Sequence, residues 1–109
     1  NAFVVAPGGI GTVLELFYTW QLAQVRHIHS KPIILLGDMW QGLLAWIQDP
    51  LLTGRYIDAR DLDLVYCVSS CSEAFEIITK SHEAYIRGDE AFCRDYHQYK
   101  LKPPEAMQG

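Results

Sequence analysis

Apolar residues gather in three short runs along the chain, and a helical pattern of apolar and polar positions follows each run. The runs cover residues 2–6, 33–36 and 64–68. Continuous apolar runs of this length are typical of strands that are buried on both faces of a parallel sheet. The pattern therefore predicts three buried strands, each followed by a helix.

The first two helices are predicted from their apolar stripes and from the residues at their ends. The first should run from Thr12 to about Ile28, with Thr12 and Glu15 in the spacing of a capping box. The second should begin with Asp38 as its cap and end before Pro50, because proline cannot continue the hydrogen bonds of a helix.

The third helix is predicted to begin after Ser70, which forms a second capping-box pair with Glu73. Beyond Gly88 a last helix is indicated by three aromatic residues at helical spacing, which are Phe92, Tyr96 and Tyr99. Residues 103–109 are rich in polar and small residues and are interpreted as a frayed tail.

Strands that alternate with helices predict an α/β fold in which right-handed crossovers join parallel strands. Three strands make a small sheet, and the first run is as apolar as a central strand. The chain also begins with Asn1, directly before that run. We therefore expect the chain to be part of something longer. The sheet's neighbour could come from upstream sequence, from a second polypeptide or from a symmetric partner chain.

Composition narrows the class of protein. In 109 residues, 50% of them apolar, there is material for one domain, and the net charge of -4 provides no basic surplus for binding nucleic acid. Three cysteines do not suggest a disulfide scaffold, and a reducing cytoplasm fits them better. The sequence has no apolar run of the roughly 20 residues that cross a membrane and no recognisable signal peptide.

The candidate chemistry lies between the first strand and the first helix, in the stretch Pro-Gly-Gly-Ile-Gly-Thr at residues 7–12. Open α/β sheets bind ligands at this position, and free N–H groups of the first helical turn attract anions. The stretch is neither Gly-x-Gly-x-x-Gly nor a P-loop, since no Lys follows its last glycine. The residues alone leave two interpretations open: an anion-binding loop and a plain turn.

The stretch from Pro7 to Glu15 resembles the signature Pro-Gly-Gly-x-Gly-Thr-x-x-Glu of the LOG family, whose members are often called lysine decarboxylases. A looser resemblance continues to about Lys80. It implies a three-layer, Rossmann-like domain with a parallel sheet, of which residues 1–88 are the C-terminal part and residues 89–109 a terminal helix and tail. It also implies phosphoribohydrolase activity on nucleoside 5'-monophosphates such as AMP, including cytokinin ribotides.

The resemblance also implies roles for the residues of the signature. Glu15 would be the catalytic carboxylate near the ribose, although the spacing alone favours a helix cap. Family members are usually dimers, so a homo-oligomer is implied, and neither a cofactor nor a metal is expected. The substrate's 5'-phosphate would be held by Gly8, Gly9, Ile10, Gly11 and Thr12.

The chain departs from the family pattern in one respect. Members carry an upstream Gly-rich loop and an upstream motif with a catalytic Arg, and this sequence contains neither before the signature. We therefore expect the 109-residue chain to be inactive alone, unless the missing N-terminal half of the domain is supplied by another polypeptide.

Two further groups of residues offer weaker candidates. His27 and His29 with Cys67 and Cys71 have no usual zinc spacing, so helix-end histidines and core cysteines explain them better. Two arginines at positions 55 and 60 precede the third run, where they could lie near a phosphate or base, or be solvated loop charges.

Two alternatives to the hydrolase remain at this stage. A non-catalytic carrier of a nucleotide or of molybdenum cofactor could share the Gly-rich architecture, although a pure anion binder has little need of Glu15. A scaffold or assembly fragment would be favoured if Glu15 served only as a cap.

Overall fold

The computed structural model describes residues 2–26 and 31–100 of the chain. Its sheet has three parallel strands in the order β1-β2-β3, with β1 at Phe3–Val5, β2 at Ile33–Leu36 and β3 at Val65–Val68. The register aligns the first residues of the three strands side by side. The predicted α/β fold with a parallel sheet is confirmed.

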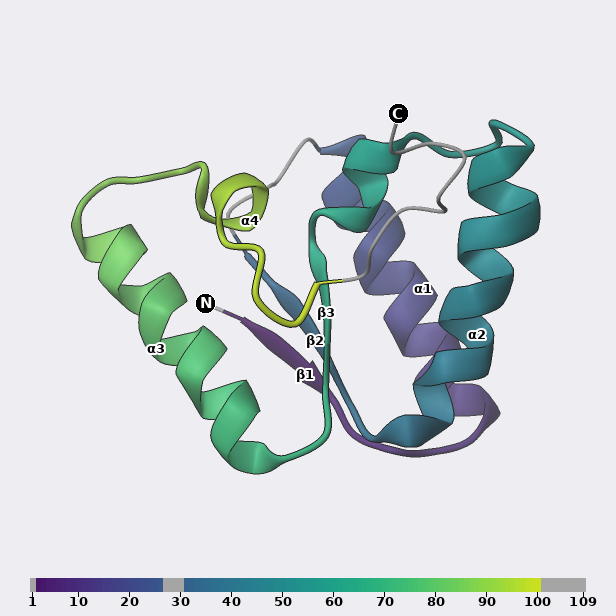
Figure 1. Ribbon diagram of the computed structural model, residues 1–109, viewed down its shortest axis with the longest axis horizontal. Coiled ribbons are helices and arrows are strands. Elements are labelled where there is room, and N and C mark those ends of the chain that lie inside the picture. Colours follow the sequence, from purple (N-terminus) through teal and green to yellow (C-terminus); the bar gives the residue numbers. More distant parts are fainter. Residues whose placement is uncertain (1, 27–30, 101–109) are drawn as a thin grey trace.

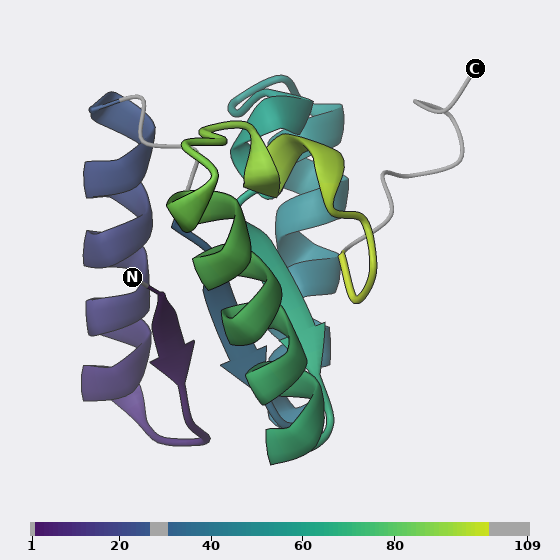
Figure 2. The same cartoon turned by 90° about the vertical axis from the view of Figure 1, so that its left-hand side faces the viewer.

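Helices cover both faces of the sheet and make a three-layer arrangement. Helices α1 (Ile10–Val25) and α2 (Gln41–Trp46) lie on one face, and α3 (Cys71–Ile86) lies on the other (Figure 1, Figure 2). All three connect or follow parallel strands, as the crossover rule requires. Within the described residues, no helix is long and apolar enough to cross a membrane.

The second helical segment is longer than predicted. A 3₁₀ turn at Asp38–Trp40 precedes α2, and a π-helical segment, η2, at Ile47–Thr53 continues past Pro50. The prediction that the helix ends before Pro50 is therefore wrong. Proline lacks an N–H group, and a π turn is one arrangement in which a helix accommodates the lost hydrogen bond. The prediction that Asp38 caps the helix is also wrong, because no side-chain cap hydrogen bond forms there.

The start of α3 is confirmed. Ser70 is the N-cap, and its Oγ accepts a hydrogen bond from the Glu73 N–H at 3.2 Å. The Glu73 carboxylate reaches back one residue further than in a standard capping box, where it accepts from the Ser69 N–H at 2.8 Å and from the Ser69 hydroxyl at 3.0 Å. Three hydrogen bonds therefore fix the loop that follows β3.

The core lies around β2 and β3, whereas β1 is only half covered. Ile33, Ile34 and Leu35 are fully buried, but Phe3 is 45% and Val4 48% exposed. The expectation that the first strand is buried on both faces is therefore wrong for the described residues. The physical reason is that β1 is an edge strand, since in the described ranges it pairs with β2 alone.

The C-terminal segment differs most from the sequence prediction. Helix α4 has a single turn at Phe92–Asp95, and Tyr99 then adopts a positive φ of 66°. The Tyr99 carbonyl accepts a hydrogen bond from the Cys67 N–H at 2.9 Å, and Tyr66 and Lys100 form an antiparallel bridge. A helix through Tyr99 is therefore wrong, because this backbone pairs with the outer edge of β3 instead.

Candidate functional site

The loops that follow the three strands meet at one edge of the sheet, the lower edge in Figure 1. Gly37 has a φ of 110°, and a Cβ built on it would lie 3.1 Å from Cγ of Pro7. The Gly8 N–H donates to Sδ of Met39 at 3.3 Å, and the Gly37 N–H donates to the Val68 carbonyl at 2.9 Å. The loop after β2 is therefore packed against the glycine loop after β1.

The glycine loop turns directly into α1. Gly9 is the N-cap, with φ of -106° and ψ of -150°, and its carbonyl accepts the first helical hydrogen bond from the Val13 N–H at 3.1 Å. No side chain caps this end of the helix. The first N–H groups of a helix have no partner within the helix, so those of α1 point toward the loop. Such an end attracts an anion through N–H groups and the helix dipole.

The first capping box that the sequence suggested does not form. Because α1 begins at Ile10, two residues earlier than predicted, Thr12 is the third residue of the helix and Glu15 lies beyond its first turn. The first turn contains no acidic residue. The cap interpretation of Glu15 is therefore wrong, and its exposed carboxylate is not used to hold the helix end.

Thr12 and Glu15 line the same cleft. This cleft, of about 430 Å³, lies between α1 and the open side of β1, and Leu16 and Thr19 continue its helical wall. Residues 2–7 form the opposite wall. A hydroxyl group and a carboxylate therefore face a common space beside the glycine loop, at the edge strand of the sheet.

Close packing within the loop explains the first glycine of the motif. A Cβ on Gly8 would lie 2.9 Å from Cβ of Thr12, which is closer than two such atoms can approach. Gly9 and Gly11 differ, because a Cβ at either position meets no atom of the described residues within 4 Å. Gly8 is thus required for the approach of Thr12, and the other two glycines leave the outer side of the helix end open.

The arginines singled out from the sequence lie elsewhere. Arg55 is exposed with a φ of 64°, and Arg60 pairs with Asp58 at 3.6 Å on the surface. Both precede β3, so they lie at the amino-terminal edge of the parallel strands, opposite the glycine loop. They are solvated loop charges, which was one of the two interpretations left open by the sequence.

The metal candidates are not brought together either. His27 and His29 lie outside the described residues, and Cys67 and Cys71 are both free thiols. Burial raises the pKa of the Cys67 thiol, and Gln41 Nε2 donates to its sulfur at 3.4 Å. Across the ranges that the structure describes, no three His, Cys, Asp or Glu residues form a group that could hold a metal ion.

Sequence reasoning missed the contribution of Met39 to this edge. Its thioether sulfur accepts from the Gly8 N–H, one of the donors near the start of α1. The available signal was Gly37, whose position directly after an apolar run indicates a sharp turn. A sharp turn does not reveal which side chain crosses to a loop 31 residues away.

A parallel sheet lies between two layers of helices, and the glycine loop follows the carboxyl end of one of its strands. These features define a Rossmann-like α/β protein. The family model described as possible lysine decarboxylase matches residues 1–78. Because this match covers most of the chain, the chain belongs to that family, which is the LOG family indicated by the signature.

Curated relatives carry a more specific name. The chain is 34% identical over 84 residues to a "Cytokinin riboside 5'-monophosphate phosphoribohydrolase" of Mycobacterium tuberculosis, a match that covers 74% of this chain and 43% of the relative. A protein of the same name from Mycobacterium marinum is 33% identical over 79 residues, with coverages of 70% and 41%. Another from Rhodococcoides fascians is 30% identical over 69 residues, with 62% and 34%. The chain thus spans less than half of the length of each of these relatives.

Proposed function

We propose that the complete protein hydrolyses the N-glycosidic bond of a nucleoside 5'-monophosphate, such as AMP, to a free base and ribose 5-phosphate. One observation carries this proposal: Thr12 and Glu15 face the same cleft beside the glycine loop. The names of the relatives, each a phosphoribohydrolase acting on a riboside 5'-monophosphate, support the same reaction.

The phosphate in this proposal binds at the start of α1. Backbone N–H groups of the loop and of the first helical turn donate to its oxygens, and the Thr12 hydroxyl adds a further donor. The Gly8 N–H would exchange the sulfur of Met39, a weak acceptor, for a phosphate oxygen. Hydrogen bonds to a charged group are worth about 1.5–3 kcal/mol each, more than the dipole alone. The residues that we propose for phosphate binding are Gly8, Gly9, Ile10, Gly11 and Thr12.

Glu15 is the proposed catalytic carboxylate. It follows Thr12 by three residues, so it shares the same side of α1 and lies about 4.5 Å further along the helix axis. A ribose attached to a phosphate at the helix end therefore extends toward it. A carboxylate there can stabilise the oxocarbenium-like transition state, orient the sugar hydroxyls or activate the attacking water.

The rest of the active site belongs to further polypeptide in this proposal. The cleft is bounded on one side by the edge strand β1, whose Phe3 and Val4 side chains are about half exposed. A parallel strand paired with β1 would bury both side chains and bring its own following loop to the same edge. We expect the 109-residue chain to be inactive until that part is present.

We also propose that the protein is a homo-oligomer that uses the outer side of α1. Leu14, Tyr18 and Val25 are exposed and follow one another at helical spacing on that side. A second copy offers the same stripe, and a two-fold interface is self-complementary. Sedimentation of the complete protein and of its Tyr18→Lys variant tests this, since a buried lysine should dissociate the assembly.

The test of the function is an assay of ribose 5-phosphate release from AMP by the complete protein. Glu15→Gln removes the charge and keeps the shape, so kcat should fall by about 10²–10⁴ while AMP still binds. Glu90→Gln, an exposed carboxylate in a loop beyond α3, is the matched control and should retain full activity. Full turnover by Glu15→Gln would remove Glu15 from catalysis, and AMP binding without any turnover by the wild type would indicate a carrier.

A further inference from the structure

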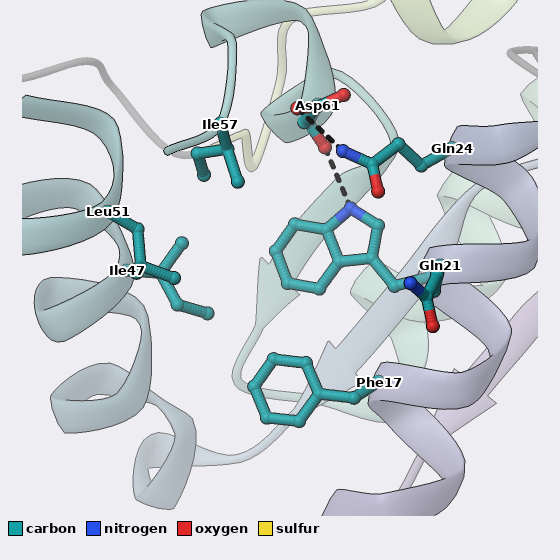
Figure 3. A pocket seen from close by; sticks show the side chains of 8 residues that line it. Phe17, Gln21, Gln24, Ile47, Leu51, Ile57 and Asp61 are labelled. Carbon is teal, nitrogen blue, oxygen red and sulfur yellow. Dashed lines mark hydrogen bonds between the residues drawn. The ribbon is translucent and has the colours of Figure 1, made fainter. Parts of the chain in front are cut away.

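A second pocket, separate from the glycine loop, lies between α1 and the continuous helical segment formed by α2 and η2. It has a volume of about 250 Å³. Figure 3 shows the side chains that line it. One wall is aromatic and comes from Phe17 and Trp20 of α1. The facing wall is aliphatic and includes Ile47, Leu51 and Ile57. The two walls face each other across a narrow apolar slot.

The two rings of the aromatic wall have the same orientation. The rings of Phe17 and Trp20 are almost parallel, with an interplanar angle of 5° and centroids 6.3 Å apart. Trp20 is only 7% exposed, so its ring is held by packing and presents its remaining surface to the slot. In Figure 3 the rings are seen face-on, and the aliphatic side chains lie beyond the ring edges. A planar ring suits such a slot, since its face packs well against ring edges and against branched aliphatic side chains.

One end of the slot is polar and fixed by hydrogen bonds. The 3₁₀ turn η3 (Ala59–Leu62) carries Asp61, whose backbone carbonyl accepts from Nε1 of Trp20 at 2.8 Å. Its carboxylate oxygen Oδ2 accepts from Nε2 of Gln24 at 3.0 Å and from the Asp58 N–H at 2.9 Å. A carboxylate offers about four acceptor positions, so this one can accept a further donor.

We propose that this slot binds a flat molecule of one or two rings that carries an N–H donor at its edge. A dry apolar cavity of about 150 Å³ binds benzene, and drug-sized ligands occupy about 300–1,000 Å³, so this slot suits a molecule between the two. The rings lie between Trp20 and Leu51, and the N–H donates to the Asp61 carboxylate. A nitrogen heterocycle of the indole or purine type has this combination of a flat face and a donor edge.

The slot is independent of the proposed active site. Trp20 follows Thr12 by eight residues, which is about 12 Å along the axis of α1. Asp61 precedes β3, so it lies near the amino-terminal ends of the strands, whereas the glycine loop lies at their carboxyl ends. Filling the slot should therefore leave phosphate binding at the start of α1 intact.

The test is a ligand-observed NMR titration of the complete protein with indole and with 1-methylindole, which lacks the N–H. Indole should bind with a Kd of about 1 mM or below, a reasonable limit for so small a ligand. Loss of the hydrogen bond to Asp61 should weaken 1-methylindole by about tenfold. Equal affinity for the two probes would refute the donor contact, and binding of neither at millimolar concentration, as when a second copy covers the slot, would refute the site.

Three variants locate the binding. Ile57→Trp fills the slot and should abolish indole binding. Tyr56→Trp adds an indole ring to the neighbouring residue, which is 80% exposed and does not line the slot, and should leave the Kd within about twofold. Leu51→Phe is a smaller change that should also weaken indole binding, and it provides the test if Ile57→Trp does not fold. Undiminished indole binding by folded Ile57→Trp or Leu51→Phe would overturn the proposal.

Discussion

An alanine at Gly8 should destabilise the protein, whereas an alanine at Gly11 should not. The added Cβ at Gly8 would lie 2.9 Å from Cβ and 3.3 Å from Cγ2 of Thr12. The hydroxyl oxygen of Thr12 would lie closer still. Rotation about χ1 moves this oxygen and Cγ2, but the position of Cβ is fixed by the backbone of the first turn of α1. Forced overlap of this kind typically costs about 1–3 kcal/mol.

Gly11 is the matched comparison. It is the second residue of α1, and a Cβ there meets no atom of the described residues within 4 Å. Alanine is favoured over glycine within a helix by up to about 1 kcal/mol. The two substitutions are chemically identical and only a few residues apart, yet they should change the free energy of unfolding in opposite directions.

Equilibrium denaturation in urea measures both effects, with the m-value checked for constancy. The free energy of unfolding should be highest for Gly11→Ala, intermediate for the wild type and lowest for Gly8→Ala. A Gly8→Ala variant as stable as wild type would contradict the reasoning, because it would show that Thr12 does not approach the glycine as the structure describes.

The same pair separates stability from phosphate binding. If the backbone N–H groups of the loop bind phosphate, the methyl group of Gly11→Ala stands on the side that the anion approaches. Its KM for AMP should then rise by about 10–100-fold although the protein is no less stable. An unchanged KM would mean that the phosphate does not bind next to Gly11. The prediction on stability would not be affected.

Two further predictions concern α3 and the buried thiol. Ser70→Ala removes the N-cap hydrogen bond and should lower the free energy of unfolding by about 1 kcal/mol, measured in urea against exposed Thr79→Ala; equal losses would mean that the cap contributes nothing. Burial raises the pKa of Cys93 to about 12, so at pH 8 its thiol stays protonated and should resist alkylation, while exposed Cys71 reacts. Mass spectrometry of iodoacetamide-treated protein checks this, and rapid labelling of native Cys93 would contradict it.

The strands were predictable because continuous apolar runs allow few alternatives. The ends of the helices were harder to predict. Thr12 with Glu15 and Ser70 with Glu73 have the same spacing, but only Ser70 takes the N-cap position of its helix. Gly9 takes the N-cap position of α1 instead. The spacing alone does not show whether a threonine or a preceding glycine takes the N-cap position, since both are acceptable N-caps.

The candidate site was predictable as far as it depends on one stretch of sequence. The position of the glycine loop between strand and helix followed from the order of the elements. The contact of Met39 with Gly8 and the cleft shared by Thr12 and Glu15 did not, because both depend on how separate elements pack. The π-helical passage through Pro50 also escaped prediction, because proline ordinarily ends a helix.

The two outer strands of the sheet, β1 and β3, differ in how far their free backbone groups are covered. On the β3 side, the backbone of Tyr99 and Lys100 already occupies hydrogen-bonding positions, and Lys100 is tied to Asp63 at 3.7 Å. On the β1 side, the described residues leave the outer backbone of the strand uncovered. Exposed strand edges recruit other strands. Any chain that joins this sheet, in folding, in assembly or in aggregation, should therefore add at β1, the side on which the cleft opens.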